Sequence, residues 1–268
     1  MDNIQIGFIG AGNMASAIIN AVITNNLYCE NQIGIFDIDK SKYTHLMNIK
    51  VNHYDSIAKL VKSCRFIFLA VKPQNYKEVL EEISLLTDRD KVFISIAAGI
   101  SIDYINSCLK YKYPVVRAMP NTPLLLGCGA TVLCRSKNTC DNDFNIVYNI
   151  FNSCSETYIL PEDKMNTVIS VSSSSPAYIY LLVKAMADYS VSNGIDYNTA
   201  ISLICKTLSG SAKMIKESGY AICDLIDMVA SPGGTTLKAI ESLDNSGFCT
   251  IIKKAMDECT KRAFEISK

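Results

Sequence analysis

The chain has 268 residues, and its 26 basic and 26 acidic residues give a formal net charge of zero. This length suits one large or two medium domains with ample room for a hydrophobic core. The balanced charge argues against nucleic acid and against an acidic membrane surface as partners, because both attract an excess of positive charge.

Eleven cysteines are scattered along the chain without a C-x-x-C pair, and no signal peptide is recognisable before them. We therefore expect a cytoplasmic protein whose thiols are reduced and packed as small hydrophobic side chains. The spacing of the nearest pair, Cys134 and Cys140, fits no common zinc site, so we expect no metal. No apolar run reaches the length of a membrane span, and we expect no membrane partner.

The amino-terminal part contains a short apolar run that predicts a β-strand: Ile4, Ile6, Phe8 and Ile9. The pattern G-x-G-x-x-A follows directly, with Gly10, Gly12 and Ala15 at its fixed positions. In the dinucleotide fold the first glycine makes a tight turn, the second lets the pyrophosphate approach, and the small third residue lets the helix pack closely. Residues 15–22 continue as an apolar helix. This context favours dinucleotide binding over a purely structural glycine turn.

A second strand is predicted over Ile33–Phe36, and it ends in Asp37. Asp37 lies close to the ~20-residue offset expected for the acid that binds the ribose of the adenosine half. A carboxylate there accepts hydrogen bonds from the ribose hydroxyls of NADH and repels the 2′-phosphate of NADPH. Lys40 and Lys42 could compensate, and Asp37 could instead cap the following turn. We expect NADH or NADPH as the cofactor, with a slight preference for NADH.

Further strand-like runs alternate with helical runs over residues 65–71, 91–96, 114–118 and 130–134. Such alternation predicts an α/β fold with a parallel, doubly wound (Rossmann) sheet. Small or polar residues follow three of these strands, in the segments Val71–Gln74, Ala97–Gly99 and Arg117–Pro123. Each segment alone is equally compatible with a surface or loop-stiffening role. Together they favour a ligand site, because such sheets bind ligands outside the carboxyl ends of their strands.

The strand pattern stops near residues 160–163. Apolar residues then repeat at helical spacing over 179–186 and 201–215, and residues 248–266 form one more long helical pattern. We therefore predict a dinucleotide-binding domain over residues 1–161 and an all-helical domain over residues 162–268.

The run Asp227–Thr236 has a glycine-rich tip between two apolar helical stretches. Pro232 fixes one φ angle, while Gly233 and Gly234 let successive N–H groups converge on a ligand. A helix that starts at or just after Thr235 adds unpaired N–H groups and its dipole to the attraction for a carboxylate or phosphate. An ordinary helix–turn–helix loop has a similar composition. Beside a dinucleotide domain, however, the run predicts an anion site and an active-site cleft between the domains.

In this order, these runs resemble the pyrroline-5-carboxylate reductase family over essentially the whole chain. The resemblance is carried by Phe8–Ala15, Ala70–Pro73, Ser95–Gly99, Arg117–Pro123, Ser174–Tyr178 and Asp227–Thr236, of which the last is the most specific. It implies the reduction of pyrroline-5-carboxylate, a cyclic imine, to L-proline with NAD(P)H. It also implies a helical domain that forms a homodimer, with dimers commonly assembled into decamers.

The resemblance further implies the residues of the site. The substrate carboxylate would bind to Ser231, Gly233, Gly234, Thr235 and Thr236. The Thr236 hydroxyl would be catalytic, as hydrogen-bond partner or proton donor at the ring nitrogen. The cofactor would bind to Gly10, Gly12, Asn13, Met14, Ala15, Asp37, Ala70, Val71, Lys72, Pro73, Ala97, Ala98, Asn121 and Glu162. The family usually has glycine where this chain has Ser173, and many members have a small polar residue or threonine where it has Asp37.

Two other functions stay open. A β-hydroxyacid dehydrogenase shares the overall plan and needs a catalytic lysine on the first helix of the second domain, where Lys184 lies. The surroundings of Lys184 lack that family's glycine-rich lead and trailing asparagine. A nonenzymatic dinucleotide-sensing or scaffold protein would need a damaged substrate turn, and the turn here is intact.

Overall fold

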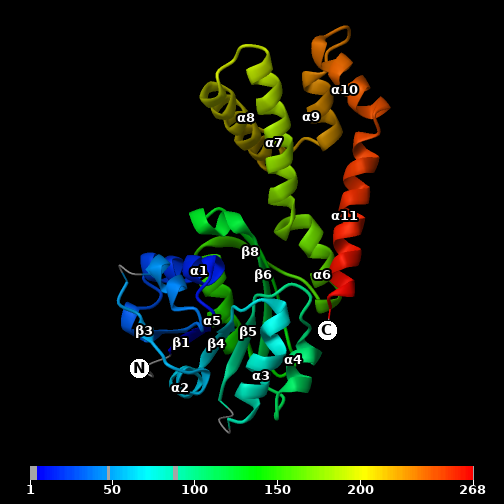
Figure 1. Cartoon of the computed structure of the whole chain (residues 1–268). Coiled ribbons are helices and arrows are strands. Elements are labelled where there is room, and N and C mark those ends of the chain that lie inside the picture. Colours follow the sequence, from blue (N-terminus) through cyan, green and yellow to red (C-terminus); the bar gives the residue numbers. More distant parts are fainter. Residues whose placement is uncertain (1–4, 47–48, 87–89, 268) are drawn as a thin grey trace. The chain divides into compact units, whose positions relative to one another are not determined.

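The structure, a computed structural model, describes residues 5–46, 49–86 and 90–267, so Ile4 of the predicted first strand lies outside the described residues. The chain forms two compact units, Met1–Pro176 with Cys259–Lys268, and Ala177–Glu258. We call them the sheet unit and the helical unit (Figure 1). The units separate after Pro176, whereas the sequence predicted a boundary after residue 161. The difference arises because Met165, Val168 and Ala263 pack into the core of the sheet unit.

One eight-stranded sheet, in the order β3-β2-β1-β4-β5-β6-β7-β8, forms the centre of the sheet unit. The strands are β1 Ile6–Ile9, β2 Ile33–Phe36, β3 Asn52–His53, β4 Phe66–Leu69, β5 Val92–Ser95, β6 Val115–Pro120, β7 Gly129–Arg135 and β8 Ser155–Ile159. Neighbouring strands from β3 to β6 are parallel, which confirms the predicted doubly wound sheet. β7 is antiparallel to β6, since only the short 3₁₀ segment η4 (Thr122–Leu126) joins them and a parallel crossover needs a dozen or more residues.

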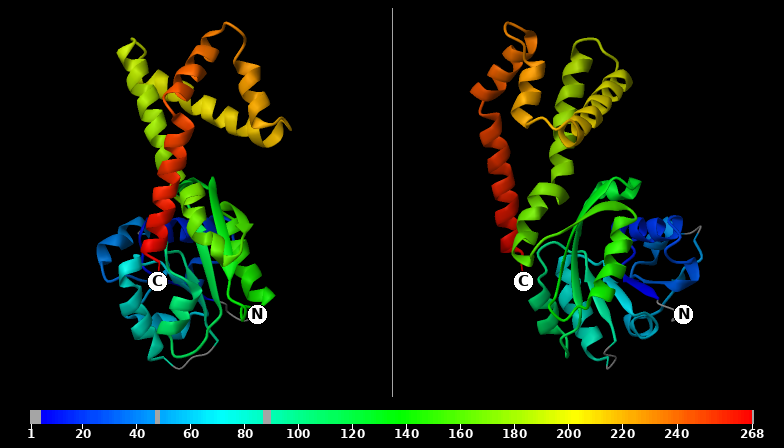
Figure 2. Two further views of the ribbon diagram at one scale, coloured as in Figure 1. Left: turned by 90° about the vertical axis from the view of Figure 1, so that its right-hand side faces the viewer. Right: turned by 180° about the vertical axis from the view of Figure 1, so that it is seen from behind.

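Helices cover both faces of this sheet (Figure 2). On one face, α1 (Asn13–Thr24) and α5 (Asp141–Asn152) pack over the stacked rings of Phe8 and Phe68. The other face is covered by α2 (Ile57–Ser63), α3 (Tyr76–Ser84), α4 (Ile102–Cys108) and α6 (Met165–Val168). β1 and β4 are buried along their whole length, as expected for strands covered on both faces.

Short helical segments occupy several connections of the sheet unit: η1 Glu30–Gln32, η2 Lys40–Leu46, η3 Pro73–Asn75, η4, η5 Glu162–Lys164 and a π-helical turn, η6, Ile169–Ser173. Three of them follow the carboxyl ends of mutually parallel strands, η2 after β2, η3 after β4 and η4 after β6. They therefore set the backbone direction at the edge of the sheet where the sequence predicts the cofactor.

The helical unit is built from α7 (Ser175–Ser192), α8 (Tyr197–Glu217), α9 (Ile222–Val229), α10 (Thr235–Asn245) and α11 (Phe248–Glu265), of which α7 begins and α11 ends in the sheet unit. The predicted helices are confirmed, and residues 248–266 agree with α11 to one residue. Of the described residues of this unit, Ala187, Ala200 and Ile204 are its only buried apolar side chains, while Leu181 and Tyr189 are more than two-thirds exposed. So much uncovered apolar surface indicates an interaction face.

All eleven cysteines are free. Cys64, Cys134 and Cys154 are buried, as predicted, and burial raises the pKa of Cys64 and of Cys134 to about 12. The prediction is wrong for six exposed cysteines: Cys29, Cys128, Cys140, Cys205, Cys223 and Cys249. Across residues 5–46, 49–86 and 90–267, no helix has both the length and the apolar character of a membrane span.

Candidate active site

Except for Glu162, which follows β8, the predicted cofactor residues follow five neighbouring parallel strands. The glycine turn follows β1, Asp37 follows β2, Ala70–Pro73 follow β4, Ala97 and Ala98 follow β5, and Asn121 follows β6. Because β2, β1, β4, β5 and β6 are adjacent in the sheet, all these residues lie at one edge of it. From β1 the chain proceeds to β2 on one side and later returns to β4 on the other. This reversal of direction is the place where doubly wound sheets bind dinucleotides.

The two glycines of the turn differ in what an added side chain would meet. Gly10 has a φ of +105°, and an added Cβ would lie 2.5 Å from the carbonyl oxygen of Ala70. Gly12 is the N-cap of α1, and an added Cβ there meets no atom of the described chain within 4 Å. The first turn of α1 has no acidic residue. Open space beside the uncapped N–H groups of a helix fits a pyrophosphate, so the turn fits a dinucleotide.

Asp37 faces inward, with 7% of its side chain exposed. Its Oδ2 accepts a hydrogen bond from the Ala11 N–H at 2.8 Å, and its Oδ1 accepts one from the Asp39 N–H at 2.9 Å. The Lys42 Nζ lies 3.3 and 3.4 Å from the two oxygens. Asp37 therefore caps the turn that follows it, one of the two roles expected from the sequence, and it also braces the glycine turn.

Asn121 and Glu162 have protein partners of their own. The Asn121 side chain donates to the Ser172 carbonyl at 3.1 Å and accepts from the Ala130 N–H at 2.9 Å. The Glu162 Oε1 accepts from Arg117 Nη1 at 2.9 Å and from the Ile102 N–H at 2.8 Å. Asn121 thus links the end of β6 to β7 and to the π-helical turn. Glu162 links β6 to the start of α4.

Arg117 begins a segment that the sequence analysis expected to follow a strand, but β6 extends to Pro120, so Arg117 lies within the strand. Its side chain is 3% exposed in β6, where Glu162 is its ionic partner and its Nη2 lies 3.5 Å from Asn166 Oδ1. The available signal was a charged residue within an apolar strand, since arginine is almost never fully buried without a partner. Lys72, by contrast, is exposed at the start of η3.

The predicted substrate turn joins α9 to α10 in the helical unit. The Gly234 N–H donates to the Ser231 carbonyl at 2.9 Å, with Pro232 and Gly233 (φ +72°) at the two central positions, which is the pattern of a type II turn. A Cβ at Gly234 would lie 2.7 Å from Ser231 Oγ. The Gly234 N–H is used within the turn, so the groups that remain for an anion are the first N–H groups of α10 and the hydroxyls of the turn.

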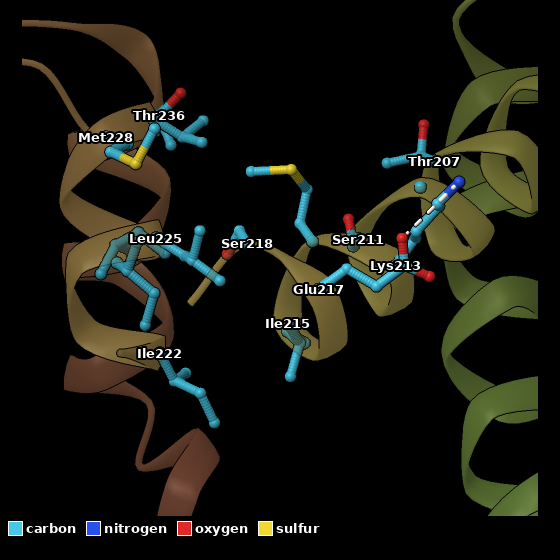
Figure 3. A pocket seen from close by; sticks show the side chains of 15 residues that line it. Thr207, Ser211, Lys213, Ile215, Glu217, Ser218, Ile222, Leu225, Met228 and Thr236 are labelled. Atoms are coloured by element: carbon cyan, nitrogen blue, oxygen red, sulfur yellow. Dashed lines mark ion pairs between the residues drawn. The ribbon is translucent and has the colours of Figure 1, made fainter. Parts of the chain in front are cut away.

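Thr236, on the first turn of α10, lines an apolar cavity of about 870 Å³ within the helical unit. Figure 3 shows Thr236 beside Met228, with Ile222 and Leu225 further along α9 and α8 opposite. A hydroxyl beside an apolar wall makes stronger hydrogen bonds than one in water, because the local dielectric constant is lower. Nowhere in the described chain do three or more His, Cys, Asp or Glu side chains gather as a metal site would require.

Two further residues flagged by the sequence can now be placed. Lys184 pairs with Asp188 one turn later on the exposed surface of α7, and this carboxylate raises the pKa of Lys184. A lysine that acts as a general base needs the opposite shift. Ser173 ends the π-helical turn, where its hydroxyl is buried and has no hydrogen-bond partner within the described residues.

A doubly wound sheet with an open glycine turn, followed by helices that include a glycine-rich turn before an uncapped helix, is typical of NAD(P)H-dependent oxidoreductases. Two family profiles match: "NADP oxidoreductase coenzyme F420-dependent" over residues 5–99, and "Pyrroline-5-carboxylate reductase dimerisation" over residues 162–266. The second covers the helical unit, and oligomerisation fits its uncovered apolar side chains.

Relatives of known name extend the similarity to the full length. The chain is 35% identical over 265 residues to the pyrroline-5-carboxylate reductase of Escherichia coli, covering 98% of each chain. It is 33% identical over 271 residues to that of Methanosarcina acetivorans, covering 100% of each. The crystal structure of Plasmodium falciparum pyrroline carboxylate reductase with NADP bound has a TM-score of 0.92, 30% identity and 100% coverage of both chains. The chain belongs to the pyrroline-5-carboxylate reductase family.

Proposed function

We propose that this protein reduces pyrroline-5-carboxylate to L-proline with NAD(P)H, the last step of proline biosynthesis. The observation that carries the proposal is the Ser231–Gly234 turn, which leads directly into α10. Among the described residues no side chain caps α10, so its first N–H groups are available to a substrate carboxylate.

Each part of the turn has a role in this proposal. The carboxylate accepts hydrogen bonds from the α10 N–H groups and from the hydroxyls of Ser231 and Thr235. The Thr236 hydroxyl donates a hydrogen bond to the ring nitrogen of an imine, or accepts one from the N–H of an iminium. Hydride addition to the iminium carbon gives a neutral amine, which takes its last proton from water. Bound NAD(P)H supplies the hydride for the imine carbon. Because a protonated imine is already electrophilic, the protein contributes mainly orientation and the exclusion of water.

The cofactor residues are those expected from the sequence. The Gly10–Ala15 turn binds the pyrophosphate, and Asp37 lies at the adenosine end. The segments Ala70–Pro73 and Ala97–Ala98, with Asn121, line the nicotinamide side. In this proposal Glu162 acts mainly through Arg117, which it holds beside the strand ends.

The same proposal includes the assembly. The protein is a cytoplasmic homodimer through its helical unit, assembled further into a decamer as its family resemblance implies. The exposed apolar side chains of α7 support the dimer, since a single copy leaves them in water. Residues 1–161 and 162–268 are the two functional domains.

The test is an assay that follows nucleotide oxidation with pyrroline-5-carboxylate and either NADPH or NADH. We expect substrate-dependent oxidation and stoichiometric formation of proline. Lys184→Met serves as a control variant and retains full activity, because the Lys184 ammonium is exposed and pairs with Asp188 on the same helix. Oxidation with neither nucleotide would refute the proposal, and loss of activity in Lys184→Met would favour the dehydrogenase alternative.

A further inference from the structure

The turn after β2 holds two opposite charges in contact, one buried and one accessible. The Asp37 side chain is 7% exposed and that of Lys42 is 43% exposed. The Asp37 backbone is also fixed, because its N–H donates to the Tyr43 hydroxyl at 2.8 Å and its carbonyl accepts from that hydroxyl at 3.1 Å. Asp37 thus has little freedom to turn toward a ligand.

The oxygens of this carboxylate are largely occupied. An ionised carboxylate offers about four acceptor positions. The N–H groups of Ala11 and Asp39 take one position on each oxygen, and the Lys42 ammonium lies across both. The ribose hydroxyls of NADH would therefore have to displace an ammonium group in order to donate to Asp37.

A ribose 2′-phosphate, by contrast, can bind without displacing the Lys42 ammonium. It accepts hydrogen bonds, and the accessible group beside Asp37 is a donor with a positive charge. Charge-assisted hydrogen bonds of this kind are about twice as strong as neutral ones. The Asp37 carboxylate, enclosed by two N–H groups and by Lys42, repels such a phosphate less than an open carboxylate would.

The neighbouring charges favour the same anion. The Asp39 carboxylate is turned onto Ser41, whose N–H and hydroxyl donate to its Oδ1 at 3.1 and 2.6 Å. Lys40 is exposed. With Asp37 buried, the charges of residues 38–42 that face water are one negative, from Asp39, and two positive, from Lys40 and Lys42.

We propose that Lys42 selects the cofactor and that it selects NADPH, by pairing with the 2′-phosphate of the adenosine half. In this arrangement Asp37 positions Lys42 and the glycine turn, and it does not hydrogen-bond to the ribose hydroxyls. This inference rests on the proposed function, since it assumes that the strand ends bind a dinucleotide. It reverses the preference for NADH that the sequence alone suggested.

Calorimetric titration tests the inference without any turnover. The dissociation constants of NADPH and NADH are measured, together with those of adenosine 2′,5′-bisphosphate and adenosine 5′-monophosphate, which differ only in the 2′-phosphate. The variants are Lys42→Met and, as a matched control with the same loss of charge two residues away, Lys40→Met. We expect wild type to prefer NADPH, and Lys42→Met to reduce the NADPH/NADH affinity ratio by on the order of tenfold or more. Lys40→Met should change the ratio less than about threefold.

Each outcome decides a different point. An unchanged ratio in a folded Lys42→Met protein, or an equal loss in Lys40→Met, would overturn the role of Lys42. Wild type that prefers NADH, with a preference lost in Asp37→Ser, would restore the direct role of Asp37. Failure of both nucleotides to bind wild type would refute the proposed function itself.

Discussion

Removing the carboxylate of Glu162 tests whether this residue serves the fold or the cofactor. Its Oε1 satisfies two groups at once, the Nη1 of Arg117 and the N–H of Ile102, and Arg117 is 3% exposed. Glu162→Ala therefore leaves a guanidinium buried without its ionic partner and an N–H at the start of α4 without its acceptor. Breaking a buried ion pair in this way costs about 3–5 kcal/mol.

Solvent reduces this cost, since 36% of the Glu162 side chain is exposed. We therefore expect a loss of about 2–3 kcal/mol. For a unit in the range of 150–250 residues, this corresponds to a decrease in Tm of roughly 5–10 °C. Glu162→Gln retains an oxygen acceptor and loses only the charge, so the decrease should be about half as large.

The assay is thermal unfolding by circular dichroism, with the dissociation constant of NADPH measured on the same proteins. Asp163→Asn is the matched control, because this adjacent carboxylate pairs with Lys164 at the exposed surface and its removal should leave the Tm nearly unchanged. A role in the fold predicts a lower Tm in Glu162→Gln with nucleotide affinity retained at low temperature. An unchanged Tm in Glu162→Ala, or equal losses in the Asp163→Asn control, would refute the reasoning.

Three further changes test the other sites. Gly12→Val fills the open space beside the start of α1, so calorimetry should show loss of nucleotide binding in a folded protein; retained affinity would exclude Gly12 from the pyrophosphate site. Thr236→Ala should lower kcat by about 10- to 100-fold with a smaller change in KM, and Thr236→Ser should recover much of it; full kcat in Thr236→Ala would leave Thr236 with a structural role only. Ser173→Ala removes a buried hydroxyl that has no partner in the described chain, so urea unfolding should show a gain of about 1 kcal/mol; a loss of stability would mean that the hydroxyl has a partner.

Local pattern was sufficient for much of this protein. Apolar runs and the glycine spacing predicted β1, β2 and the turn between β1 and α1, because parallel strands buried on both faces must be apolar and the tight turn after β1 requires glycine at position 10. Helical spacing predicted α11 to one residue, and the order of Pro232 and two glycines predicted the turn before α10. These features depend on residues that lie close together along the chain.

Other features depended on contacts between distant residues, and only the tertiary structure decided them. Glu162 and Arg117 are 45 residues apart, so no local pattern could pair them. Asp37 and Ala11 meet only because β1 and β2 are adjacent, which turns the acid inward and leaves Lys42 facing outward. β7 reverses direction because its connection is too short for a crossover. Short-range periodicity determines which elements form, whereas the partners of a buried charge are determined by which strands lie side by side.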